Sequence, residues 1–118
     1  MAFDYDVLIE IRTVPNSDST SPVFIQGGGQ KSYLRTIMMH NTSVGVVNIK
    51  LHRVPNDSGS VGIAHSLNVF VNEDLTPGET LLIEITSPGM VFRQANDSLF
   101  AYASVDNVVT IQAYGGVE

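Results

Sequence analysis

The chain has 118 residues and no cysteine, a length that predicts one domain whose core forms without disulfides or a thiolate zinc site. Twelve acidic residues against six basic residues give a net charge of −6. The basic residues are scattered along the chain, so we expect no nucleic-acid partner.

The N-terminal segment carries Asp4 and Asp6 where a secretory signal would carry positive charge, so we expect no signal peptide. Nowhere do about 18 apolar residues run together, so we expect no membrane-spanning helix and no membrane partner.

Apolar residues recur at every second position along most of the chain, which is the period of a β-strand. In chain order, this pattern predicts strands over residues 5–13, 23–26, 31–40, 44–54, 64–71, 79–86, 91–93, 98–104 and 108–114. The alternation is clearest in the fourth, sixth and last of these segments.

Residues that favour turns lie between the predicted strands, at positions 14–16, 27–29, 41–43, 55–59, 76–78, 88–89 and 106–107. No segment has the pattern of a capped amphipathic helix of ten residues or more, so we expect no substantial helix. Many short strands at near-regular spacing predict an all-β fold, an antiparallel β-sandwich of about eight strands.

The alternation assigns one face of each strand to a core between two sheets. The residues expected in this core are Ile37, Val47, Ile49, Leu51, Val69, Leu81, Ile83, Ile85, Leu99, Ala101, Val109 and Ile111. Other apolar residues fall on the opposite faces: Leu82, Phe100, Tyr102, Val108 and Tyr114. These are either scattered surface groups or, if contiguous, a subunit contact.

The residues that could carry catalysis or bind metal are widely spaced. His40, His52 and His65 are at least twelve residues apart and form no His-x-His pair, and residues 27–29 lack the lysine and helix of a phosphate-binding loop. Asn72-Glu73-Asp74 offers oxygen ligands without the spacing of a calcium loop. We therefore expect no catalytic site, no metal site and no cofactor.

A longer pattern covers about three-quarters of the chain. A strand ends in the turn Asn41-Thr42-Ser43, and the next strand ends at Val54-Pro55. They are followed by Leu75-Thr76-Pro77-Gly78-Glu79-Thr80-Leu81, by the turn Asn96-Asp97-Ser98-Leu99, and by a last strand that ends in Gly115-Gly116-Val117-Glu118. This order resembles small virion structural proteins of tailed bacteriophages, of the head-decoration (cement) type or related tail-associated β-domains.

The resemblance implies a jelly-roll-like subunit, often a homotrimer, that is made in the host cytoplasm and reinforces the capsid surface by binding the major capsid protein at capsomer junctions. Residues 1–22 would form an arm that docks on or exchanges with a neighbour, and residues 23–118 a single sandwich domain. Apart from the resemblance, the alternation places apolar residues away from the core, and from these we expect an interface that includes Met1, Phe3, Tyr5, Leu82, Phe100 and Tyr102. A phage tail, neck or fibre component is an alternative within the same class.

A carbohydrate-binding sandwich is an alternative from another class. In that case Tyr33, Phe100, Tyr102 or Tyr114 would stack on sugar rings, although the absence of tryptophan weighs against it.

Overall fold

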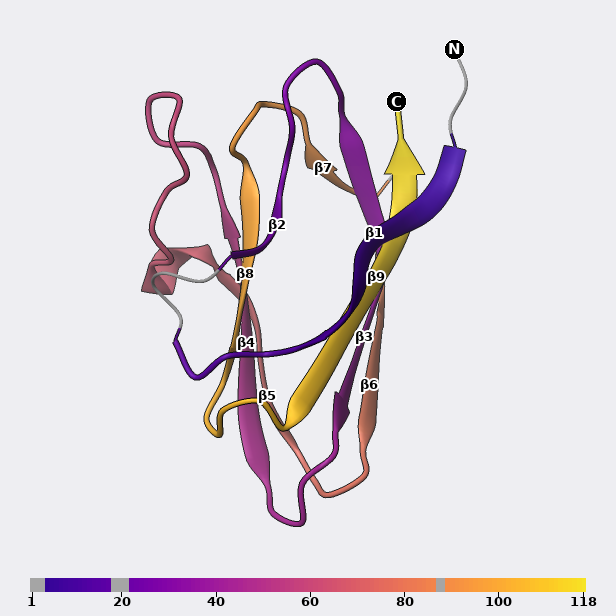
Figure 1. Ribbon diagram of the computed structural model, residues 1–118, viewed down its shortest axis with the longest axis vertical. Helices are drawn as coiled ribbons and strands as arrows, with labels where there is room; N and C mark the ends of the chain where they lie inside the picture. Colours follow the sequence, from indigo (N-terminus) through magenta and orange to yellow (C-terminus); the bar gives the residue numbers. More distant parts are fainter. Residues whose placement is uncertain (1–3, 18–21, 87–88) are drawn as a thin grey trace.

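The computed structural model describes residues 4–17, 22–86 and 89–118 and shows two antiparallel β-sheets packed face to face (Figure 1). The all-β prediction is confirmed, because the one helical element in these ranges is a short 3-10 helix, η1, at Ser66–Asn68. The strands are β1 (Asp4–Thr13), β2 (Pro22–Ile25), β3 (Ser32–Asn41), β4 (Val47–Val54), β5 (Val69–Leu75), β6 (Thr80–Glu84), β7 (Met90–Phe92), β8 (Ser98–Ala103) and β9 (Val109–Val117).

The strand order shows how the chain is folded. Sheet A has the order β1-β9-β3-β6, with β7 also paired to β3, and sheet B has the order β2-β8-β4-β5. The pairs β4·β5, β3·β6, β2·β8 and β1·β9 are nested, as if one long hairpin had been wrapped into two sheets. This nesting is the jelly-roll arrangement, as expected.

Strands β6 and β7 occupy one position in sheet A, which reconciles nine strands with the expected eight. Thr36 of β3 pairs with Glu84 of β6, and Leu34 pairs with Met90 of β7. At the break between β6 and β7, the Gly89 N–H donates to the Thr86 carbonyl at 2.8 Å. A Cβ at residue 89 would lie 2.6 Å from the Leu34 carbonyl oxygen, so glycine allows this close approach.

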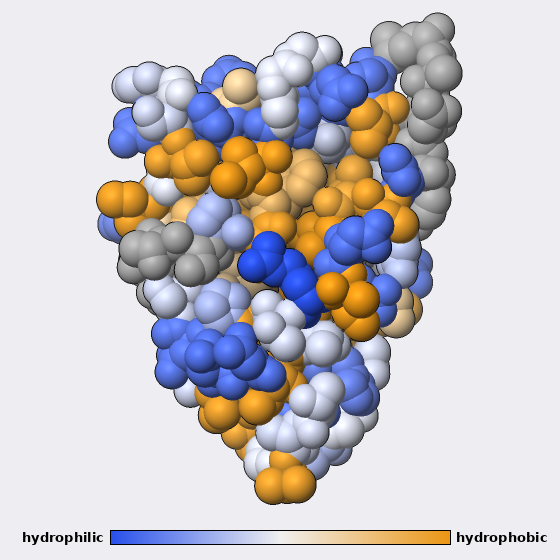
Figure 2. Space-filling model, viewed as in Figure 1, coloured by the Kyte–Doolittle hydropathy of each residue, from blue (hydrophilic) through white to orange (hydrophobic). Residues whose placement is uncertain are grey.

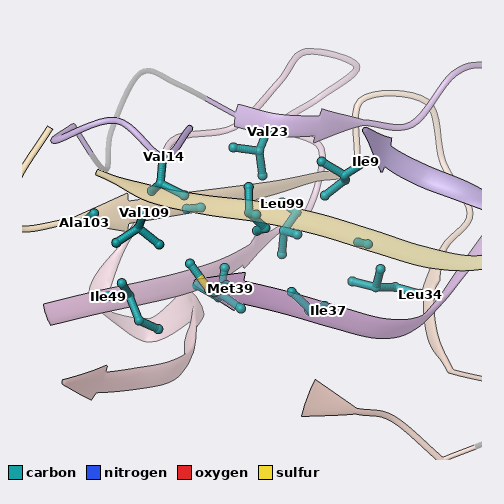
Figure 3. Close-up of a cluster of buried hydrophobic side chains, with 14 of the residues drawn as sticks. Ile9, Val14, Val23, Leu34, Ile37, Met39, Ile49, Leu99, Ala103 and Val109 are labelled. Atoms are coloured by element: carbon teal, nitrogen blue, oxygen red, sulfur yellow. The ribbon is translucent and has the colours of Figure 1, made fainter. Parts of the chain in front are cut away.

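The core lies between the two sheets (Figure 3). Eight of the twelve residues expected there are fully buried, and Leu81, Ile83 and Ile85 are partly buried against them. Val69 was wrongly assigned to the core, and Val71 packs there instead. A bulge in the β4–β5 ladder places Val71 opposite Leu51 and Val69 opposite His52, which shifts the alternation by one residue.

Two predicted strands begin three or more residues later than expected. Residues 64–68 do not form a strand, because His65 caps η1 with its side-chain Nδ1, which accepts the Leu67 N–H at 3.1 Å. Strand β4 begins at Val47 and not at Val44, because residues 42–46 form a turn organised by Asn41.

The described N-terminal residues belong to the sandwich. Strand β1 pairs with β9 of the same chain along the edge of sheet A, and Ile9 and Val14 are buried in the core. Within residues 4–17, the segment expected to form an arm thus pairs with its own chain. Exchange of β1 with a neighbour stays a prediction.

Candidate functional site

Part of the outer face of sheet B is shielded by the chain itself. Val54, His52 and Phe100 alternate with core residues and lie outside the core cluster, yet each is at most 3% exposed. The connection from β4 to β5, residues 55–68, returns against this sheet (Figure 1). A Cβ at Gly62 would lie 2.8 Å from Val54 Cγ1, so the connection packs directly on β4.

The buried carboxylate of Asp97 attaches this connection to the sandwich. Its Oδ1 accepts the Asn56 N–H at 2.9 Å, and its Oδ2 accepts the N–H groups of Arg93 and Gln94 at 3.3 and 3.1 Å. Burial alone would raise the pKa of Asp97, but these backbone donors and the nearby charge of Arg53 hold that pKa below its usual value. The carboxylate is therefore ionised at neutral pH.

The outer face of sheet A is open. Met38 of β3 pairs with Leu82 of β6 on one side and with Gln112 of β9 on the other. Tyr114 lies one row along β9 and pairs with Val7 of β1. Leu82 is 53% exposed and Val7 is 39% exposed. Because directly opposed side chains in a sheet are neighbours, these five residues form one contiguous surface, the A-face patch.

Two tyrosine hydroxyls in or near this patch already have partners within the chain. The Tyr114 hydroxyl donates to Gln112 Oε1 at 2.6 Å, and the Tyr33 hydroxyl donates to Glu118 Oε2 at 2.8 Å. The hydrogen bond to Glu118, together with burial and the negative charge of that group, raises the pKa of Tyr33. If a partner covered this face, these two hydroxyls would thus keep their hydrogen bonds.

The turn between β3 and β4 lies at one end of the long axis of the molecule (Figure 1). Asn41 is fully buried there, and its Nδ2 donates to the carbonyls of Gly45, Leu75 and Thr76. Its Oδ1 accepts the Ser43 N–H at 2.9 Å. One side chain thus fixes two turns, those between β3 and β4 and between β5 and β6.

This fixed turn presents apolar groups to solvent. Val44 is 99% exposed and Val46 is 60% exposed. Figure 2 shows an apolar group at the corresponding tip of the molecule, surrounded by weakly polar surface.

Of the six residues expected at an interface, the three whose side chains the structure describes do not gather on one surface. Met1 and Phe3 lie outside the described residues, as does the side chain of Tyr5, whose backbone pairs with Gly116. Leu82 lies on the open face of sheet A. Tyr102 is half-buried on sheet B, with Lys50 Nζ 5.3 Å from its ring centroid.

The expectation that Phe100 is exposed is wrong. It points away from the core, as the alternation predicted, but it is 1% exposed and offers no surface to a partner. Phe100 lies inside sheet B in the shielded part of its outer face, between Pro22 of β2 on one side and His52 of β4 on the other.

The four aromatic residues considered for sugar stacking are also separated. Tyr33 and Tyr114 belong to sheet A, Tyr102 lies on sheet B, and Phe100 is buried. They form no common platform for a sugar.

Two shallow, open depressions lie elsewhere, each of about 330–340 Å³. One is lined by Gly29, Gln30, Lys31, Arg93 and Glu118, and the other lies under the β4–β5 connection. Among the described residues, no group of three or more His, Asp or Glu side chains could hold a metal ion. In the same ranges, no helix is long and apolar enough to cross a membrane.

Asn41 and Asp97 are the structural residues that the sequence pattern did not single out. Each stands in a recognised turn motif, and the tendency of asparagine and aspartate to bond nearby backbone was the available signal. Their contacts to distant turns gave no signal in the sequence. No protein-family model, curated protein or solved structure matches this chain.

Proposed function

We propose that the protein is a non-enzymatic structural subunit of a virion, of the decoration or cement type, which binds the major capsid protein and stabilises the shell. The observation that carries the proposal is Val44, a fully exposed apolar side chain on a turn that buried Asn41 holds fixed. A rigid turn loses little conformational entropy when it binds. The free energy gained by burying even a small apolar side chain is therefore not offset by the cost of ordering the turn.

The jelly-roll fold supports this assignment, because this architecture is common in viral capsid proteins, although it also occurs in lectins and cupins. The elongated shape, 45 × 28 × 20 Å, allows one end to contact the shell while the sides stay available to neighbouring subunits. Repetition of one small contact over a symmetric shell gives an avidity that a single contact lacks.

The first test is the protein content of purified particles from the source of this sequence, measured by quantitative mass spectrometry. A decoration subunit is expected at a copy number comparable with that of the major capsid protein. A small fraction of that number would place the chain in the tail, neck or fibre, and its absence from particles would overturn the proposal.

The second test concerns Val44. Purified protein is mixed with capsids that lack it, and bound protein is measured after sedimentation. Val44→Asp is expected to weaken binding at least about tenfold, because the charged group would have to lose its water at the contact. Ile63→Asp is the matched control, since Ile63 is 71% exposed on the β4–β5 connection and its replacement should leave binding unchanged.

A further inference from the structure

The end of the molecule that carries Val44 is made of three turns (Figure 1). Thr42, in the turn between β3 and β4, donates its N–H and its hydroxyl to the Val108 carbonyl at 2.9 and 2.6 Å, which joins that turn to the turn between β8 and β9. Asn41 joins it to the turn between β5 and β6 through its bond to the Thr76 carbonyl. We call this surface the Val44 end; it comprises residues 42–48, 72–80 and 104–108.

All charged residues of the Val44 end have the same sign. They are Glu73, Asp74, Glu79 and Asp106, and all four are exposed. These three segments contain no lysine, arginine or histidine. An exposed apolar group, Val44, therefore stands on a surface whose charge is entirely negative.

Two of these carboxylates are held in place by hydrogen bonds. Asp74 Oδ1 accepts a hydrogen bond from Asn48 Nδ2 at 3.0 Å, and Glu79 Oε1 accepts the Thr76 N–H at 2.8 Å. Fixed charges present a pattern that a partner can match without first ordering long side chains. Part of the charge pattern is thus fixed, as is the turn that carries Val44.

The opposite end of the molecule carries charges of both signs. Lys31 directly precedes strand β3, whose ten residues end at Asn41, so it lies roughly 30 Å from the Val44 end. Lys31, Arg93 and Glu118 line one depression there. Charge of a single sign is therefore a property of the Val44 end and not of both ends of the molecule.

The sign of this charge selects the class of partner. The phosphates of nucleic acid and of anionic lipids would be repelled by four carboxylates. The same end of a second copy would be repelled as well, because it carries the same four charges. A protein surface that carries cations would be attracted, and it would still be able to bury Val44.

We propose that the Val44 end binds a protein surface on which lysine or arginine side chains border an apolar depression that receives Val44. This inference rests on the proposed function, because the surface would belong to the major capsid protein. Burial of Val44 stabilises the contact, and the complementary charges orient the subunit and accelerate its association.

The test measures the binding of the purified chain to capsids that lack it, by sedimentation at about 0.05 M and about 0.5 M NaCl. Wild-type binding is expected to weaken at least about tenfold at the higher salt concentration. The triple variant Glu73→Gln, Asp74→Asn, Glu79→Gln should bind about tenfold more weakly than wild type at low salt and lose most of its salt dependence. Its amides keep oxygens that can accept from Asn48 and Thr76, so it should fold, which circular dichroism checks.

The matched control is the triple variant Glu10→Gln, Asp57→Asn, Glu84→Gln. It changes the net charge by the same amount at three exposed positions outside the Val44 end, so its binding should stay within about twofold of wild type. Wild-type binding that does not change with salt, or equal effects of the two triple variants, would overturn this inference and leave the proposed function standing. A wild-type chain that binds at neither salt concentration would overturn both.

Discussion

The carboxylate of Asp97 accepts the backbone N–H of Asn56 at 2.9 Å, which joins the turn before β8 to the start of the β4–β5 connection. Replacement by asparagine would put an amide group against backbone donors. We expect Asp97→Asn to lower the free energy of unfolding by about 2–4 kcal/mol, measured by chemical denaturation. Asp57→Asn is the control, because Asp57 is exposed on the same connection, and its effect should stay within about 0.5 kcal/mol. Equal effects of the two changes would contradict this account of the anchor.

The same carboxylate makes stability depend on pH. Its pKa is lower in the folded chain than in the unfolded chain, where it is about 3.9. The unfolded state therefore takes up a proton more readily, and the stabilisation by Asp97 is complete above about pH 4 and is lost as pH falls through the lower folded pKa. Denaturation at steps from pH 6 to pH 2.5 should show a constant difference between wild type and Asp97→Asn above pH 4 and a shrinking difference below it. A difference that does not change with pH would refute this.

Asn41 gives a second prediction, on the turn that presents Val44. Asn41→Ala removes the donor to three carbonyls, one of them at the end of β5 and one in the β5–β6 turn, and should lower the free energy of unfolding by about 2–4 kcal/mol. Amide hydrogen exchange over residues 42–46 should also accelerate, because the turn loses its anchor. Ser43→Ala removes only peripheral bonds and serves as the control, with an expected loss of about 1 kcal/mol or less. Unchanged exchange in Asn41→Ala would show that the turn does not depend on this side chain.

Strand β1 offers a matched pair of isoleucines. Ile9 is 3% exposed and packs in the core, whereas Ile11 is 62% exposed on the same strand. Ile9→Ala should cost about 2–4 kcal/mol of stability and Ile11→Ala less than about 0.5 kcal/mol. Small losses for both would mean that β1 does not pack on its own chain in solution.

The sequence was sufficient to predict the fold class, because inward and outward residues alternate regularly in strands that are paired with another strand on each side. In β4, Val47, Ile49 and Leu51 face the core as the pattern requires. The pattern was insufficient at β5, where a bulge breaks the alternation, so that Val71 packs against the core and Val69 does not. A bulge arises from pairing with another strand, so a single strand's sequence does not reveal it.

The candidate surface was predicted only in part, for a related reason. Alternation tells on which side of a sheet a residue lies, and it placed both Leu82 and Phe100 away from the core. It does not tell what else lies on that side. The outer face of sheet B is shielded around Phe100, which is 1% exposed, whereas Leu82 on the open outer face of sheet A is 53% exposed.

Gly115 gives the last prediction, because it lies where three strands of sheet A come together. It pairs with Leu34 of β3 and with Asp6 of β1. A Cβ at this position would overlap the carbonyl oxygen of Tyr33 and lie 2.9 Å from Leu8 Cδ1. The carbonyl belongs to the backbone of β3 and cannot move without breaking the ladder, so even a methyl group would force β9 away from its neighbours.

We therefore expect Gly115→Ala to lower the free energy of unfolding by about 3 kcal/mol or more, measured by chemical denaturation. Gly45→Ala is the control, because a Cβ there has no atom within 4 Å and its effect should stay within about 1 kcal/mol. If Gly115→Ala were as stable as Gly45→Ala, strands β3 and β9 could not be as close as the pairing of Leu34 with Gly115 requires.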